Sequence, residues 1–183
     1  MHKPHLLLAK DYWKAHLKPD DFVIDATCGN GHDTLFLSEL LPEGLVYGID
    51  IQKQALENTR LRLGTAKNVQ LFHQSHSASL PLPKPPRLIV FNLGYLPGGD
   101  KSITTMTGST LDSLRYFLSI LAEDGAISMT CYPGHDEGMR EEKEVLAFVK
   151  DLNHTYHRWE KERSPTLLWI RNYTEKDLRI DRL

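Results

Sequence analysis

The apolar residues of this sequence alternate between helix-like and strand-like patterns. Residues 4–17 carry the first helical pattern, with apolar side chains three to four positions apart. Short apolar runs, partly β-branched and bounded by turn-forming residues, follow at regular intervals and predict strands. We predict strands at 22–27, 45–50, 69–74, 87–93, 126–132, 155–160 and 166–173, and further helices at 32–41, 52–63, 108–121 and 137–152.

The alternation of strands and helices predicts an α/β fold. We expect the first strands, at 22–27, 45–50, 69–74 and 87–93, to be buried, because their nearly continuous apolar runs are typical of a parallel sheet that helices cover on both faces. Only a short connection separates the last two strands, so we expect them to pair as an antiparallel hairpin at the sheet edge. We predict a Rossmann-like, doubly wound, mostly parallel sheet with a C-terminal antiparallel hairpin, in a single domain spanning 1–183.

Composition narrows the class of protein. Hydrophobic residues make up 40% of the chain and charged residues 25%, and no apolar run reaches the roughly 18 residues of a membrane helix. The first residues lack the long apolar stretch of a secretory signal, so we expect a cytoplasmic protein with Cys28 and Cys131 as free thiols. The formal net charge of −2 gives no overall basic field, and any contact with RNA must therefore be local.

The segment DATCGNG at 25–31 follows the first sheet strand and opens a helix. Gly29 and Gly31 allow a tight turn and a close approach to a ligand. A dinucleotide fingerprint would need a third glycine where Thr34 stands, which favours a ligand without a pyrophosphate. Asp25 can accept hydrogen bonds from a cationic amino group. S-adenosylmethionine has such a group and no phosphate.

Asp50 ends the second strand, where a carboxylate can accept hydrogen bonds from both hydroxyls of an adenosine ribose. Asp33 either contacts the cofactor or only favours the dipole of the helix that it begins. His73 and His76 are too few for a metal site, so we predict no metal.

Two of these segments, DATCGNG at 25–31 and GID at 48–50, resemble the first two motifs of class I methyltransferases. The resemblance extends over the whole chain in the order of its elements and implies the class I methyltransferase fold, with S-adenosylmethionine as cofactor. In this class the end of the third strand meets the adenine amino group. Ser75 and His76 are the candidates here. Together with the resemblance, the sequence predicts as cofactor-binding residues Asp25, Cys28, Gly29, Asn30, Gly31, Asp33, Asp50, Ile51, Gln52, Ser75, His76 and Asn92.

The segment FNLGYLPGGDKS at 91–102 follows the fourth strand. It resembles the motif of amino-directed methyltransferases, in which an Asn, Asp or Ser precedes two prolines and an aromatic residue. Asn92 and Tyr95 match its ends, whereas other residues replace both prolines. Tyr95 could also be an ordinary core aromatic. An alkylamine has a pKa of about 10, so either burial lowers it or His76, His135 or Asp33 accepts its proton. Our predicted catalytic residues are Asn92, Tyr95 and His76.

The combination of these motifs with ALENTR at 55–60 and Y-x-GH-x-EG at 132–138 is more specific than the class I signature. It resembles the small bacterial family of tRNA 5-(aminomethyl)-2-thiouridine methyltransferases, MnmM. The resemblance implies N-methylation of the 5-aminomethyl group of the wobble 2-thiouridine at tRNA position 34, with the anticodon stem-loop as partner and a homodimer as assembly. Methylation of rRNA or of a small-molecule amine, and a non-catalytic cofactor-binding module, are the alternatives. A basic rim for RNA could form from Lys101, Arg140, Lys143, Arg158, Lys161 and Arg163.

Overall fold

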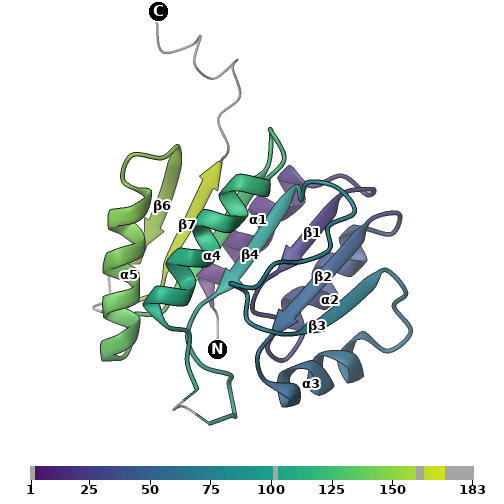
Figure 1. The fold of residues 1–183 in the computed structure, drawn as a ribbon, viewed down its shortest axis with the longest axis horizontal. Helices are drawn as coiled ribbons and strands as arrows, with labels where there is room; N and C mark the ends of the chain where they lie inside the picture. The colour runs from purple at the N-terminus through teal and green to yellow at the C-terminus, as the bar shows by residue number, and fades with distance from the viewer. Residues whose placement is uncertain (1–2, 101–102, 160–162, 172–183) are drawn as a thin grey trace, which may run out of the picture.

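One seven-stranded sheet organises the computed structural model, which describes residues 3–100, 103–159 and 163–171 (Figure 1). Its strands are β1 (Phe22–Asp25), β2 (Leu45–Asp50), β3 (Val69–His73), β4 (Leu88–Asn92), β5 (Ala126–Cys131), β6 (His154–Arg158) and β7 (Thr166–Arg171). They lie in the order β3-β2-β1-β4-β5-β7-β6. The first five run parallel, and β7 runs antiparallel to both of its neighbours.

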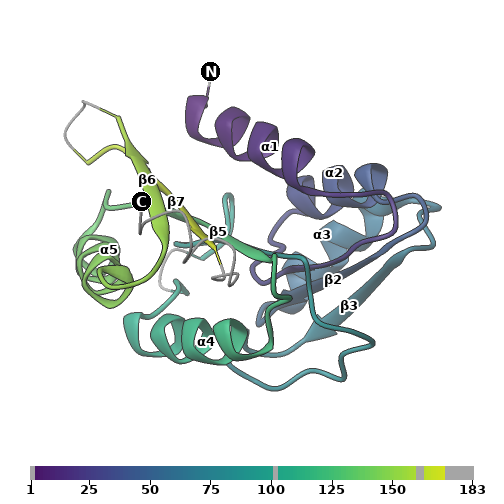
Figure 2. The same ribbon diagram turned by 90° about the horizontal axis from the view of Figure 1, so that it is seen from above.

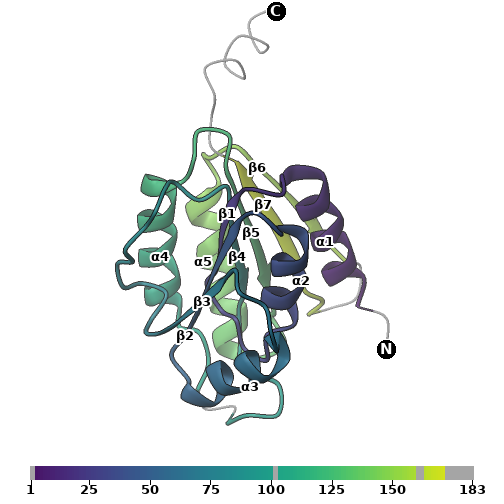
Figure 3. The same cartoon turned by 90° about the vertical axis from the view of Figure 1, so that its right-hand side faces the viewer.

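Helices cover both faces of this sheet. They are α1 (Pro4–His16), α2 (His32–Leu40), α3 (Lys53–Leu63), α4 (Thr107–Ile120) and α5 (Asp136–Val149). Figure 2 shows α1, α2 and α3 over one face and α4 and α5 over the other, and Figure 3 shows the same two layers from the side. The alternating pattern of the sequence therefore predicted the architecture correctly, including the antiparallel pairing of the last two strands.

Burial separates the central strands from the two edges. Strands β1, β4 and β5 are buried along almost their whole length because a strand lies on each side of them and helices cover both faces. The prediction that 69–74 is a buried strand was wrong in this respect, because β3 stands at the sheet edge and is partly exposed. The predicted strand residues 160 and 172–173 lie outside the described residues.

Two apolar clusters hold the layers together. One lies between the sheet and the pair α4 and α5 and includes Phe91 and Phe117, whose rings meet edge to face. The other lies under α1 and α2 and is built around Trp13, which is 1% exposed. Since apolar burial is roughly proportional to area removed from water, these clusters fix the sheet as a rigid base for the loops at its edge.

The strand register brings three functional strand ends together. Asp25 pairs with Gly48 of β2 and with Val90 of β4. Asp50 and Asn92 each stand two residues beyond those partners, so they flank the loop that leaves β1. The strand order reverses between β1 and β4, and open α/β sheets bind ligands at such a reversal.

Among the described residues, no helix has the length and apolar character needed to cross a membrane.

Candidate active site

The loop between β1 and α2 turns sharply because two of its glycines have positive φ. Gly29 has φ 52° and Gly31 has φ 76°. A Cβ atom at position 31 would lie 2.7 Å from Cα of Thr59, so only glycine fits between this loop and α3. Gly31 is also the residue before α2, so the same turn points the helix N-terminus toward the loop.

Helix α3 holds this loop from outside with three hydrogen bonds. Thr59 Oγ1 donates to the carbonyl of Gly29 at 3.0 Å. The Asn30 side-chain oxygen accepts from Asn58 Nδ2 at 2.8 Å, and its backbone carbonyl accepts from Arg62 Nε at 2.6 Å. Two of these α3 residues, Asn58 and Thr59, belong to the segment ALENTR, so part of this segment holds the glycine loop.

Asp25 faces the protein and does not line the cavity described below. Its carboxylate is 1% exposed and accepts from the Thr34 hydroxyl at 2.7 Å and from the Thr27 N–H at 3.3 Å. Burial, and then the negative charge of Asp33, raise the pKa of Asp25 to about 7. The structure therefore does not bring Asp25 to the ligand position that the sequence predicted, and Thr34 is instead its partner.

Asp50 lines the cavity at the end of β2. Its Oδ2 accepts from the Gly29 N–H at 3.0 Å, and its Oδ1 accepts from the Gln52 N–H at 2.9 Å. Burial raises the pKa of this carboxyl. Each carboxylate oxygen has a second lone pair, so Asp50 can still accept from hydroxyl groups of a ligand while it holds the glycine loop.

A cavity of about 1140 Å³ lies at the carboxyl ends of the strands. Eleven of the thirteen predicted site residues line it, and Asp25 and Gly31 do not. The eleven are Cys28, Gly29, Asn30, Asp33, Asp50, Ile51, Gln52, Ser75, His76, Asn92 and Tyr95. The Cys28 thiol is buried, and burial raises its pKa, so it stays protonated and neutral.

Asn92 stands at the end of β4 with its carboxamide oriented by neighbours. Its Nδ2 donates to Asp33 Oδ2 at 2.5 Å. Its Oδ1 lies 3.4 Å from the Tyr132 hydroxyl, which is a long hydrogen bond. The Asn92 N–H donates to Thr27 Oγ1 at 2.7 Å, which fixes the backbone as well. Because an amide nitrogen can only donate, the contact with Asp33 leaves Oδ1 as the acceptor.

Helix α1 brings two further polar residues to this network. Lys10 Nζ lies 3.5 Å from Asp33 Oδ1. His5 Nε2 lies 3.2 Å from the Tyr132 hydroxyl, and burial lowers the pKa of His5. The sequence analysis missed His5, Lys10 and the role of Tyr132. Tyr132 lies in the segment Y-x-GH-x-EG, but no local pattern links α1 to the end of β4.

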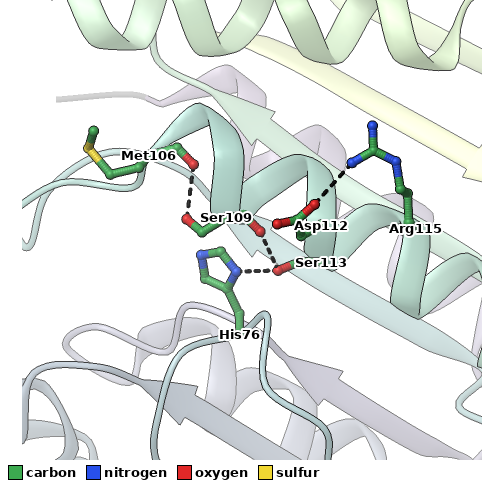
Figure 4. Close-up of polar contacts among 6 residues, drawn as sticks. All are labelled: His76, Met106, Ser109, Asp112, Ser113 and Arg115. Atoms are coloured by element: carbon green, nitrogen blue, oxygen red, sulfur yellow. Dashed lines mark hydrogen bonds and ion pairs between the residues drawn. The ribbon is translucent and has the colours of Figure 1, made fainter.

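His76 is buried and contacts α4. Its Nδ1 lies 2.5 Å from Ser113 Oγ, and the Ser113 hydroxyl lies 2.7 Å from the Ser109 carbonyl (Figure 4). The single Ser113 hydroxyl proton goes to that carbonyl, so Nδ1 of His76 is the donor and Nε2 carries a lone pair. Burial lowers the pKa of His76 to about 4, so the ring is neutral at physiological pH.

The low pKa of His76 bears on its predicted catalytic role. An alkylamine has a pKa of about 10, so a ring that ionises several units lower is a poor proton acceptor for it. A neutral ring with an unprotonated Nε2 can instead accept a hydrogen bond from an amino group. The geometry thus favours the cofactor-binding assignment of His76 over proton transfer.

Tyr95 lies at the cavity and is 41% exposed, so it is not an ordinary core aromatic. Its ring centroid is 6.0 Å from that of His135, which also lines the cavity. Nδ1 of His135 accepts from the Gly138 N–H and caps α5, while its Nε2 has no hydrogen-bond partner among the described residues.

The predicted basic rim is only partly assembled. Arg163 lines the cavity, and Arg140 and Lys143 are exposed on α5. Arg158 forms an ion pair with Glu142 at 2.6 Å, so its charge is already compensated. Lys101 and Lys161 lie outside the described residues. Within the described part of the chain, no three His, Cys, Asp or Glu side chains cluster as a metal site.

Comparisons with known proteins match this geometry. The family model described as "Putative rRNA methylase" matches residues 46–165. The Arabidopsis thaliana protein named "tRNA (mnm(5)s(2)U34)-methyltransferase, chloroplastic" is 42% identical over 155 residues, which are 76% of this chain and 57% of the relative. The chain thus spans little more than half the length of that relative.

Solved structures are similar over nearly the whole chain. A "putative rRNA-methylase" from Clostridium thermocellum is 34% identical with a TM-score of 0.89, and the match covers 94% of this chain and 100% of that one. A "putative methyltransferase" from Streptococcus mutans in complex with SAH is also 34% identical, with a TM-score of 0.80 and the same coverage. The sheet and helices therefore form the class I methyltransferase fold.

Proposed function

The chain belongs to the family described as "Putative rRNA methylase", and on that premise we propose that it methylates an amine of tRNA with S-adenosylmethionine. The acceptor is the 5-aminomethyl nitrogen of the wobble 2-thiouridine at position 34. The product is 5-methylaminomethyl-2-thiouridine. The observation that carries this proposal is the oriented carboxamide of Asn92, which stands in the same cavity as the cofactor-side residues.

The residues of the cavity fit S-adenosylmethionine. Asp50 has acceptor capacity left for two ribose hydroxyls, and unprotonated Nε2 of His76 suits the adenine amino group. Gly29 has no Cβ and lines the cavity, so a ligand can approach the loop backbone closely there. When bound, S-adenosylmethionine supplies a methyl group already activated by its sulfonium.

Asn92 determines which acceptor atom suits the site. Its Oδ1 can accept a hydrogen bond from an amine N–H and thereby point the nitrogen lone pair at the methyl carbon. A carbon nucleophile has no such N–H to donate. The new bond joins this nitrogen to the methyl carbon, and the carbon–sulfur bond breaks with its electron pair passing to sulfur. Positioning is the main contribution that the protein makes to such a displacement.

The amine must lose one proton, either before or after the displacement. Asp33 is the carboxylate next to Asn92, and its side chain is 13% exposed. It lines the cavity, so a water or the amine itself can reach it. We propose Asp33 as the group that takes the proton, directly or through a water, because its carboxylate lies next to Asn92 and lines the cavity.

The tRNA assignment is supported by the name of the Arabidopsis relative and by the motif resemblance, whereas the family description says rRNA. A tRNA substrate and an rRNA substrate differ in the RNA structure that carries the target nucleotide. An exposed Tyr95 at the cavity mouth suits an unpaired base, which RNA readers stack on aromatic rings. The wobble uridine is such a base. We further propose a cytoplasmic homodimer, on the basis of composition and of the resemblance.

The direct test is methyl transfer by the purified protein. We expect S-adenosylmethionine and tRNA bearing 5-aminomethyl-2-thiouridine to give the methylated nucleoside, detected by mass spectrometry of digested RNA. Matched tRNA without the aminomethyl group, rRNA and small alkylamines serve as the controls. Methylation of rRNA or of a free amine, but not of this tRNA, would favour one of the alternative substrates. Light scattering measures the molar mass in solution, and the proposed homodimer predicts twice the mass of one chain.

A further inference from the structure

The chain after Asn92 forms a loop that is closed at its base. The Thr105 N–H donates to the Gly94 carbonyl at 2.9 Å, and the Gly94 N–H donates to Thr105 Oγ1 at 2.8 Å. Tyr95 and Thr104 form an antiparallel bridge next to this pair. We call residues 94–100 and 103–105 the acceptor loop. It carries Tyr95, and it begins two residues after Asn92, below the carboxyl end of β4 in Figure 1.

A buried carboxylate on α5 holds the base of this loop. Glu141 is 2% exposed. Its Oε2 accepts from the Thr105 hydroxyl at 2.8 Å, and its Oε1 accepts from the Thr110 hydroxyl at 2.6 Å. Because the single hydroxyl proton of Thr105 goes to Glu141, the same oxygen must accept from Gly94. The hydrogen bonds thus run in one direction from Gly94 through Thr105 to Glu141.

The position of Gly94 explains why such a contact is needed. Gly94 has φ 119°, and no atom lies within 4 Å of the place where its Cβ would be. Side-chain packing therefore does not hold this residue. Glycine also has more backbone freedom than any other residue type. In the motif that the segment resembles, two prolines restrict the backbone between Asn and the aromatic residue. Here Leu93 and Gly94 stand in their place.

We propose that Glu141 is a positioning residue for methyl transfer, which fixes the Asn92–Tyr95 segment through Thr105 and Gly94. The Thr105–Glu141 contact replaces the restriction that the two prolines would supply. Glu141 does not touch the reacting atoms and acts through the loop. The effect on turnover rests on the proposed function, whereas the effect on the loop does not.

A merely structural role is the competing explanation. Glu141 also joins α5 to α4 through Thr110, so its loss could act only on stability. The two hydroxyls provide a matched pair of variants, since each removes one hydrogen bond to the same carboxylate. Thr105→Val breaks the contact to the acceptor loop, and Thr110→Val breaks the contact to α4. Thr105→Ser keeps the hydroxyl, and Glu141→Gln keeps the side-chain shape.

Hydrogen exchange of peptides covering the acceptor loop tests the proposal without any substrate. We expect Thr105→Val to speed exchange there about 10-fold or more, and Thr110→Val to leave it at the wild-type rate. Thr105→Ser should restore protection. In the methylation assay, Thr105→Val should lower kcat about 10-fold with unchanged affinity for S-adenosylhomocysteine. Glu141→Gln keeps one acceptor oxygen and should lose less than Glu141→Ala.

Two results would overturn the proposal. One is wild-type exchange of the acceptor loop in Thr105→Val. The other is an equal loss of kcat in Thr105→Val and Thr110→Val, in step with their melting temperatures, which would assign Glu141 to stability alone. If the wild-type protein methylates no tRNA, the proposed function fails, and the exchange comparison still decides whether Glu141 holds the loop.

Discussion

Asp33 and Asn92 both line the cavity and meet through a 2.5 Å hydrogen bond from Nδ2 of Asn92 to the carboxylate. Asp33 stands in the first turn of α2, and Asn92 ends β4. Hydrogen bonds to charged groups are the strong ones, so this contact determines which way the carboxamide points. The orientation that it imposes is the one in which Asn92 can accept from an amine.

Replacement of Asp33 by alanine should therefore act on turnover. The carboxamide of Asn92 would lose its partner, and the proposed proton acceptor would be absent. We expect kcat to fall about 10- to 100-fold, which corresponds to loss of one charged hydrogen bond. Asp33→Asn keeps an acceptor oxygen and should retain more activity. Loss of affinity for S-adenosylhomocysteine with unchanged kcat would instead assign Asp33 to the cofactor.

Asp50 and Asn92 should divide binding and turnover between them. Asp50→Ala removes a carboxylate from the predicted ribose position, and we expect cofactor affinity to fall by roughly 1.5–3 kcal/mol. Asn92→Ala should lower kcat with little change in that affinity. Isothermal titration with S-adenosylhomocysteine and single-turnover kinetics measure the two quantities. Equal effects of both substitutions on affinity alone would contradict this division.

Gly31→Ala should destabilise the fold more than Gly29→Ala. Both glycines have positive φ, which costs roughly 1–2 kcal/mol for an alanine. At position 31 the new Cβ would also lie 2.7 Å from Cα of Thr59, whereas at position 29 it makes an ordinary contact. Urea unfolding of the two variants measures the difference. Equal losses would mean that the approach to α3 is not what requires glycine.

Asp25 should make stability depend on pH. Its pKa rises from the usual 3.8 to about 7 in the folded protein. As pH rises between these values, the unfolded chain releases this proton while the folded protein keeps it. The free energy of unfolding should then fall by up to about 1.4 kcal/mol per pH unit, and level off above pH 7. Asp25→Asn should remove this slope, and an unchanged slope would show that Asp25 ionises normally.

Much of the fold and part of the site could be predicted because each depends on local pattern. Buried parallel strands have continuous apolar runs, and the residues that end them meet at one edge. This pattern predicted that Asp50 and Asn92 belong to the site, and both line the cavity. The direction of a side chain is not local, however. Asp25 also ends a strand, but its carboxylate is buried, accepts from Thr34 and does not line the cavity.

The contacts that support the site come from elements far apart in the sequence. Lys10 of α1 reaches Asp33, Ser113 of α4 holds His76, and Thr105 meets Glu141 of α5. Helical periodicity indicates that these helices pack on the sheet, but it does not show which polar residue meets which strand end. Partners of this kind depend on the packing of complete elements, so one sequence without a structure does not specify them.

Methyl transfer to the wobble nucleoside is the most direct test of the whole account. The measurement is mass spectrometry of nucleosides from tRNA that carries 5-aminomethyl-2-thiouridine, before and after incubation with the protein and S-adenosylmethionine. We predict that this nucleoside gains one methyl group on its amino nitrogen and that Asn92→Ala slows the gain. An unmethylated wobble nucleoside, from wild-type protein that demonstrably binds S-adenosylhomocysteine, would contradict the central claim.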